Sequence, residues 1–118
     1  MLRTSSDSVR HDAVPKERVV AAAKQWYSDL VLAHPEVIRA GFFGSYARGD
    51  YVPGSDFDVL VELSTSDIAN WRDRIGVYAP DRFPVSMNLF VYTTDELNLL
   101  RAQRDVFLTT VEPQLQWF

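Results

Sequence analysis

The sequence predicts a single α/β (α+β) domain in which a small mixed β-sheet is flanked by helices. Segments with apolar residues at helical spacing alternate with short apolar runs typical of strands, which favours a layered α/β architecture. The chain has 118 residues, of which 47% are hydrophobic, so it can bury one modest core but hardly two. The sequence contains no internal repeat, linker or low-complexity segment, so one domain is the economical interpretation.

The first predicted element is a long helix. Residues 1–14 are polar and unpatterned, and we expect them to form a flexible lead-in to a domain over residues 15–118. Pro15 fits the first turn of the helix, where its missing N–H costs little, and Pro35 ends the pattern after His34. The apolar face, including Trp26 and Tyr27 as expected core residues, consists of Val19, Val20, Ala23, Trp26, Tyr27, Leu30 and Val31.

Two strands are predicted next, on either side of a glycine-containing turn. Residues 37–43 form a nearly continuous apolar run, as expected for a strand buried on both faces, and lead directly into Gly44. Residues 56–63 alternate, so this second strand has two unlike faces. One face carries Phe57, Val59, Val61 and Leu63, and the other carries Asp56, Asp58, Leu60 and Glu62.

The remaining chain predicts a helix, a strand and a second helix. Ser64, Thr65 and Ser66 offer capping groups for a crossover helix that ends near residues 76–80, with a stripe formed by Ile68, Trp71, Ile75 and Tyr78. Residues 85–92 predict the third strand. Thr94 is expected to cap a helix that begins at Asp95, with a buried side formed by Leu97, Leu100, Phe107, Leu108 and Val111. Residues 115–118 either form a short strand or simply pack against the core.

Composition excludes several classes of protein. Cysteine is absent, which excludes disulfides, thiolate zinc sites and cysteine nucleophiles, so a metal would be held mainly by oxygen. Twelve basic residues stand against 16 acidic ones without a basic stripe, so non-specific nucleic-acid binding is not expected. No apolar run approaches the roughly 20 residues that span a bilayer, and the polar N-terminus does not resemble a secretory signal. We therefore expect a cytoplasmic protein that does not interact with membranes.

The strongest chemical signal lies in residues 41–63, GFFGSYARGDYVPGSDFDVLVEL. Gly44 permits close backbone approach, and the N–H groups that follow it, with the Ser45 hydroxyl, can receive a phosphate. Asp56 and Asp58 are two residues apart on a strand, so their carboxylates share one face and can converge on magnesium. Alone, a Gly-Ser pair is usually a turn and an Asp-x-Asp pair is usually solvated. Together they suit phosphoryl or nucleotidyl transfer.

In this order, with ten residues between Ser45 and Asp56, the motif resembles that of the minimal nucleotidyltransferases of the DNA polymerase beta superfamily. The resemblance extends weakly from about residue 17 to residue 108. It implies the nucleotidyltransferase fold, binding of the triphosphate of ATP or another nucleotide by Gly44 and Ser45, and two Mg²⁺ ions on Asp56 and Asp58. It also implies transfer of a nucleoside monophosphate, with AMP from ATP as the expected case, to a hydroxyl group.

Three further features of the sequence are weaker indicators of a functional role. Arg48 is a candidate phosphate contact, although an exposed loop arginine is as often merely solvated. Gly49 and Gly54 are expected to shape the connection to the second strand rather than touch a substrate. Asp95 and Glu96 lie beyond the third strand, where they are expected to place favourable charge in the first turn of a helix.

The sequence departs from the family pattern at one position. The family carries a third acid on the next strand, and the residue that aligns with it here is Asn88. An amide offers a metal one neutral oxygen and is a poor proton acceptor, so we expect weaker metal binding and slower catalysis.

Two functional hypotheses follow from this departure, besides a fortuitous motif in an ordinary α/β domain. One is an active enzyme in which Asp56, Asp58 and Asn88 form the catalytic group. The other is a catalytically impaired module, similar to an antitoxin, that binds a nucleotide or a partner. The family's smallest members often act beside a helical partner in toxin–antitoxin pairs, so such a partner or a homodimer is an expectation by analogy.

Overall fold

A four-stranded mixed sheet organises the chain, as the sequence predicts. The computed structural model describes residues 13–118, so most of the expected lead-in over residues 1–14 lies outside the described part. The strand order is β3-β2-β1-β4. Strand β1 (Val37–Phe43) pairs antiparallel with β2 (Phe57–Leu63) and with the short β4 (Gln116–Trp117), whereas β2 pairs parallel with β3 (Met87–Thr93).

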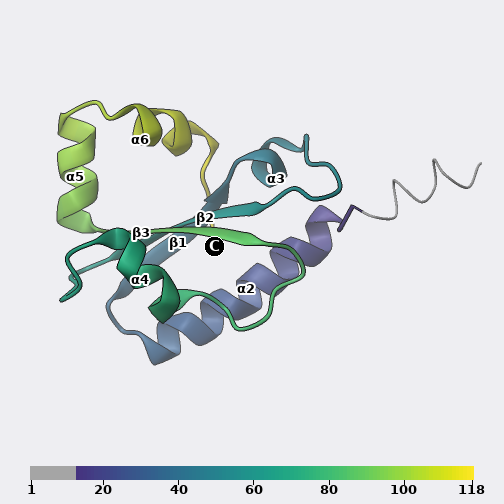
Figure 1. Cartoon of the computed structure of the whole chain (residues 1–118), viewed down its shortest axis with the longest axis horizontal. Coiled ribbons are helices and arrows are strands. Elements are labelled where there is room, and N and C mark those ends of the chain that lie inside the picture. Colours follow the sequence, from purple (N-terminus) through teal and green to yellow (C-terminus); the bar gives the residue numbers. More distant parts are fainter. Residues whose placement is uncertain (1–12) are drawn as a thin grey trace, which may run out of the picture.

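Helices cover both faces of this sheet (Figure 1). Helices α2 (Lys16–Ala33) and α4 (Trp71–Tyr78) lie on one side, and α5 (Thr94–Ala102) and α6 (Val106–Val111) lie on the other. Helix α4 is the crossover between the two parallel strands. The single-turn helix α3 (Ser45–Arg48) follows β1, and the 3-10 turn η1 (Glu112–Gln114) leads from α6 to β4. Within residues 13–118, no helix is long and apolar enough to cross a membrane.

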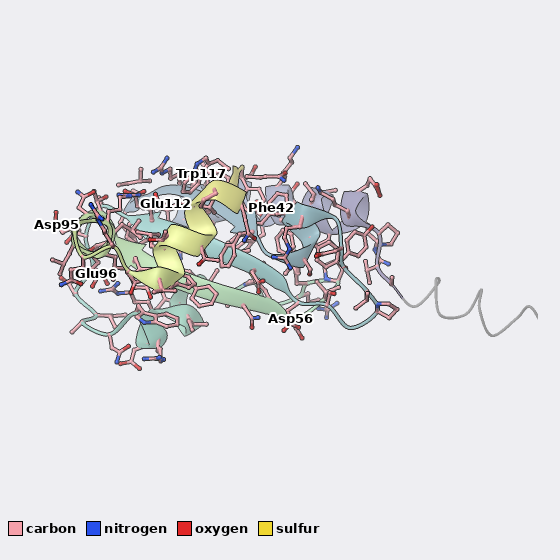
Figure 2. The ribbon with its side chains drawn as sticks, turned by 90° about the horizontal axis from the view of Figure 1, so that it is seen from above. Phe42, Asp56, Asp95, Glu96, Glu112 and Trp117 are labelled. Atoms are coloured by element: carbon pink, nitrogen blue, oxygen red, sulfur yellow. The ribbon has the colours of Figure 1, made fainter. Side chains whose placement is uncertain are left out.

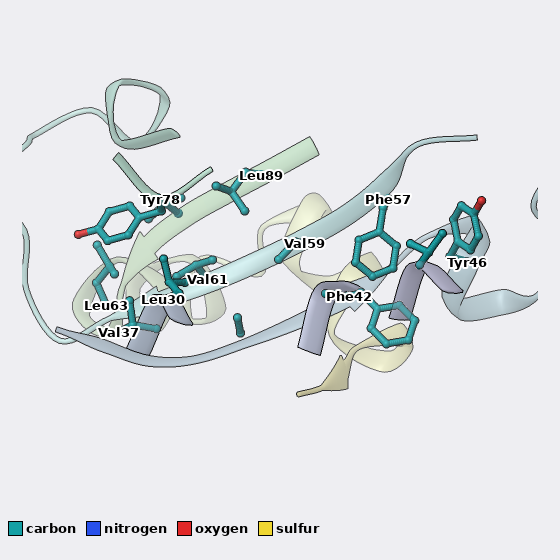
Figure 3. Close-up of a cluster of buried hydrophobic side chains, with 14 residues drawn as sticks. Leu30, Val37, Phe42, Tyr46, Phe57, Val59, Val61, Leu63, Tyr78 and Leu89 are labelled. Carbon is teal, nitrogen blue, oxygen red and sulfur yellow. The ribbon is translucent and has the colours of Figure 1, made fainter. Parts of the chain in front are cut away.

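The larger core lies between the sheet and helices α2 and α4 (Figure 3). One face of β2 supplies its centre, because alternate residues of a strand point to the same side. Trp26 and Tyr27 are partly buried at its margin, in agreement with their predicted role, and Trp26 Nε1 donates a hydrogen bond to the Tyr78 carbonyl at 3.0 Å. The buried members are Val19, Ala23, Leu30, Val37, Ala40, Phe42, Tyr46, Phe57, Val59, Val61, Leu63, Tyr78, Leu89 and Val91.

A smaller cluster packs on the opposite face of the sheet. Its buried members are Phe43, Leu60, Leu97, Leu108 and Val111. Leu60 belongs to the face of β2 that also carries Asp58 and Glu62, so the two predicted faces of this strand do bury against different helices. Burial on both faces holds for most of β1 too, although Ile38, at an irregularity in the β1–β2 pairing, is about half exposed at 49%.

The caps of α4 and α5 differ from the sequence predictions. Helix α4 is capped by Asn70, whose side chain accepts a hydrogen bond from the Arg72 N–H, and not by residues 64–66. The Ser66 hydroxyl is engaged in a local turn, where it accepts a hydrogen bond from the Ile68 N–H at 3.1 Å. Thr93, rather than Thr94, caps α5, because only Thr93 has a glutamate three residues later to complete a capping box.

The predicted final helix is interrupted. Arg104 adopts a left-handed conformation with φ of 52°, and Asp105 then caps α6 by accepting a hydrogen bond from the Leu108 N–H. The break falls where the sequence between Leu100 and Val106 offers no large apolar side chain to hold a continuous helix on the sheet.

At the other end of the chain, Pro15 occupies the cap position of α2 rather than its first turn, and His34 is the C-cap.

An ion pair between the buried Arg74 and the partly exposed Glu96 joins the two helical layers beside the edge strand β3. The Arg74 side chain is 2% exposed, and its Nη1 and Nη2 donate hydrogen bonds to the two Glu96 carboxylate oxygens at 2.6 and 3.0 Å. Arg74 also donates to the carbonyls of Val91 and Ile68. Asp95 and Glu96 do lie in the first turn of α5, as predicted. Glu96 has a second role, as the counter-ion of Arg74, which the sequence analysis does not predict.

We predict that removal of the Glu96 carboxylate destabilises the fold more than removal of its exposed neighbour. Glu96→Ala leaves the Arg74 guanidinium buried without its counter-ion and breaks the capping box, which should cost about 3 kcal/mol. Asp95→Ala removes only a favourable charge near a helix start, which should cost about 0.5 kcal/mol. Urea unfolding, monitored by circular dichroism, measures the stability of both variants. Equal losses of stability would contradict the proposed contribution of the ion pair.

A second prediction concerns acid. Hydrogen bonds from Arg74 hold the pKa of Glu96 below its ordinary value of 4.5. Because this pKa is lower in the folded chain than in the unfolded chain, the stabilisation is present above pH 4.5 and is lost as the pH falls through the lowered pKa. The stability difference between the parent and Glu96→Gln should therefore shrink with acidification. A difference that stays constant in a pH series of urea titrations would refute this assignment.

Candidate functional site

The turn at Gly44 lies directly against the Asp58 carboxylate. Strand β1 ends one residue earlier, and Gly44 adopts a φ of 79°, a conformation that glycine readily occupies. A Cβ atom at this position would collide with Asp58 Oδ2. The Gly44 carbonyl then accepts hydrogen bonds from the N–H groups of Ala47 and Arg48 and so forms the turn of α3. The absence of a Cβ at Gly44 thus lets the Asp58 carboxylate approach the turn closely.

The sheet register brings the two aspartates beside Asn88. Asp58 is opposite Phe43 in the antiparallel pairing and opposite Asn88 in the parallel pairing. Asp56 lies immediately before β2. Asn88 Nδ2 donates hydrogen bonds to Asp58 Oδ1 at 3.0 Å and to Asp56 Oδ2 at 3.2 Å. The two carboxylates thus converge on one point, as their spacing predicts, and the neutral amide occupies that point.

Burial raises the pKa of Asp58 above its ordinary value. The hydrogen bond from Asn88 opposes this shift, the negative charge of Asp56 adds to it, and the positive charge of Arg48 again opposes it. Two nearby carboxylates with a neutral amide between them therefore carry negative charge that Arg48 compensates only in part. A cation at this position would relieve it.

Arg48 and Gln114 complete the other side of the site. Arg48 forms an ion pair with Asp50, with Nε and Oδ2 3.2 Å apart, and its Nη1 donates a hydrogen bond to Gln114 Oε1 at 3.1 Å. The same Gln114 oxygen accepts a hydrogen bond from the Gly44 N–H, also at 3.1 Å. Ser45 is half-buried beside this contact. Sequence reasoning missed Gln114, because no motif links it to residues nearly 70 positions earlier.

A cavity of about 310 Å³ lies between the Gly44 turn and helix α6. Its polar wall contains Gly44, Arg48, Asp58 and Gln114, and helix α6 supplies a mostly apolar wall on the other side. The α6 residues that line it are Val106, Phe107, Thr110 and Val111. A larger depression of about 610 Å³ lies between α2 and the end of α4. None of the predicted site residues lines that depression. The smaller cavity is therefore the candidate site, because of the chemistry of its lining residues and not because of its volume.

The oxygen donors fit a hard divalent cation, although they are few. Among residues 13–118, no three aspartate, glutamate, histidine or cysteine side chains are grouped closely enough to hold a metal ion. Asp56 and Asp58 alone supply carboxylates, and rotation of the Asn88 amide would present its oxygen as a third ligand. Asp95 and Glu96 lie near the opposite end of the molecule from Asp56 (Figure 2). They therefore cannot replace the missing acid.

Comparison with known proteins gives a consistent result. Residues 23–106, which include the Gly44 turn, both aspartates and Asn88, match the family model described as a nucleotidyltransferase domain. The structure is similar to the crystal structure of a presumed nucleotidyltransferase from Sulfolobus solfataricus, with a TM-score of 0.63. That similarity covers 87% of this chain and 81% of the other at 23% sequence identity, so it concerns the fold. No curated protein matches the sequence.

We predict that Gly44 tolerates alanine less well than Gly54. Both glycines have positive φ, but a Cβ at Gly54 would meet nothing within 4 Å, whereas one at Gly44 would collide with Asp58. Gly54→Ala should cost about 1 kcal/mol from backbone strain alone. Gly44→Ala should cost at least about 2 kcal/mol more because the turn and the carboxylate must separate. Thermal unfolding of both variants measures the difference, and equal costs would contradict the close contact.

Proposed function

Because the chain belongs to the nucleotidyltransferase domain family, we propose that it transfers a nucleoside monophosphate from a triphosphate to a hydroxyl group in a magnesium-dependent reaction. ATP is the proposed donor, so that AMP is transferred. One observation carries this proposal: Asp58 lies against the Gly44 turn in one cavity, and Asp56 lies next to Asp58 because Asn88 donates a hydrogen bond to each of them. The turn alone could bind only a phosphate, and the aspartates alone could bind only a metal ion.

Gly44, Ser45 and Arg48 are the proposed triphosphate contacts. The Gly44 N–H and Arg48 Nη1 already converge on one acceptor atom, the oxygen of Gln114, which supports their use as a pair. A guanidinium suits phosphate because its N–H groups are charged and held in one plane. The Ser45 hydroxyl is a further donor or acceptor at the same turn.

Asp56 and Asp58 are the proposed magnesium ligands, and Asn88 is a weakened third ligand. When bound, magnesium would neutralise triphosphate charge and favour ionisation of the acceptor hydroxyl. The chain's own contribution is to hold the two carboxylates on a rigid central strand, next to the phosphate turn. Asn88 is neutral, so it adds no charge to the site and accepts no proton from the acceptor.

The acceptor is proposed to enter from the side of α6. Val106 is 80% exposed and lines the cleft next to Phe107, which provides an apolar surface opposite the polar turn. A helical partner protein or a second copy of the chain is the proposed source of additional acceptor contacts.

A second candidate function is a nucleotide-binding or partner-binding module without efficient catalysis. The observation in its favour is the Asn88 amide, which donates to both aspartates in place of a carboxylate. The two candidates agree on nucleotide binding and differ in transfer.

Calorimetric titration with ATP, with and without magnesium, tests the shared part of the proposal. The parent should bind ATP in a magnesium-dependent manner, and Asp56→Asn/Asp58→Asn should abolish that dependence because both carboxylates are lost. Asn88→Asp should tighten binding of magnesium–ATP by about tenfold, since an added ligand charge raises cation affinity. Asp81→Asn, an exposed acid away from the cleft, is the matched control and should bind as the parent does.

Transfer from labelled ATP then separates the two candidates. Label in an acceptor, lost in the double variant, supports the enzyme. Binding without transfer in the parent, with transfer in Asn88→Asp, supports the binding module. Absence of ATP binding in the parent and in every variant would refute the nucleotide site in both.

A further inference from the structure

The phosphate-binding donors of the proposed site are not free in this structure. Gln114 Oε1 accepts a hydrogen bond from the Gly44 N–H and another from Arg48 Nη1, each at 3.1 Å. A single oxygen that receives one backbone N–H and one guanidinium N–H has the same partners as the oxygen of a bound phosphate. The orientation of the amide is dictated by chemistry, because only its oxygen can accept from two donors.

Gln114 is held in this position from its own side of the cleft. Its Nε2 donates a hydrogen bond to the Thr110 carbonyl, and Leu115 packs against the smaller core cluster. Gln116 Nε2 donates to the Ala47 carbonyl in α3, and β4 pairs with β1. Residues 112–117 therefore cross over the Gly44 turn as a strap that is anchored at both ends.

The contact has a physical reason in the absence of ligand. Gly44 is buried, and a buried N–H without a hydrogen-bond partner is destabilising, so the Gln114 oxygen removes that penalty. A neutral amide oxygen is nevertheless a weaker acceptor than a phosphate oxygen, whose hydrogen bonds are charge-assisted and roughly twice as strong. A phosphate can therefore take over both donors. The amide and a phosphate cannot occupy the same position together.

We propose that Gln114 is an internal competitor for the triphosphate: its amide oxygen occupies the position of a phosphate oxygen at Gly44 and Arg48, and nucleotide binding displaces it. This inference rests on the proposed function, because it assumes that these two donors bind phosphate. It adds that affinity is set partly by a residue that leaves the site when the ligand enters. Such a residue lowers the affinity for nucleotide and supplies the Gly44 N–H with a hydrogen-bond partner.

Two substitutions at one position test the sign of this effect. Gln114→Ala removes the competitor, so binding of magnesium–ATP and of inorganic tripolyphosphate should become about tenfold tighter, the equivalent of two modest hydrogen bonds. Gln114→Glu retains the shape but adds a negative charge beside Arg48, so binding should weaken by at least about tenfold. Gln103→Ala, an exposed glutamine at the end of α5, is the matched control and should not change affinity.

The opposite signs distinguish competition from a structural role. A residue that merely supports the turn would weaken binding in both variants, and circular dichroism shows whether each variant remains folded. Unchanged or weaker binding in a folded Gln114→Ala would overturn the inference while leaving the proposed function intact, provided that the parent binds ATP. Binding by Gln114→Ala alone would support both. Absence of binding in the parent and all variants would refute the phosphate site itself, and the competitor with it.

Discussion

Strand β2 is paired on both edges, and the candidate site depends on this double pairing. Its antiparallel register with β1 sets Asp58 opposite Phe43, one residue before the glycine turn, and its parallel register with β3 sets the same residue opposite Asn88. A slip of one residue on either edge would move the carboxylate to the other face of the sheet. The larger core on the far face prevents such a slip, because Phe57, Val59 and Val61 are fully buried there.

The candidate site and the Arg74–Glu96 ion pair lie at opposite ends of the parallel strands β2 and β3. At the start of β2 and β3, Asp56, Asp58 and Asn88 are hydrogen-bonded side by side and remain at least partly exposed. At the other end of β3, the polar groups of Arg74 and Glu96 are engaged with each other and with backbone carbonyls. Both ends of this pair of strands therefore have charged side chains beside them, from the strands at one end and from helices α4 and α5 at the other. Only the first combines incomplete compensation of charge with a cavity, which is why a ligand is expected there and not at the ion pair.

Much of the architecture could be predicted from local sequence signals, and the exceptions have local causes. The strand over residues 37–43 and the glycine turn follow from an apolar run and one residue type. The cap of α5 was misplaced by one position because two threonines adjoin, and the break before Asp105 depends on an unusual Arg104 conformation. The proximity of Asp56 and Asp58 follows from their spacing on a strand, whereas the position of Asn88 beside them is predicted only by the family resemblance. Gln114 could not be predicted, since its contact with Gly44 arises only when β4 pairs with β1.

The two faces of the sheet are unequal in buried apolar content, and this inequality bears on motion. Helices α5 and α6 rest on a small cluster, and their residues Leu99 and Val106 are largely exposed, at 57% and 80%. The other layer shares a much larger core with the sheet. Free energies of local opening follow buried contacts, so amide hydrogens of α6 should exchange with solvent well before those of β2. The wall of the cleft can then fluctuate as a subglobal unit while the strand that carries the aspartates stays folded.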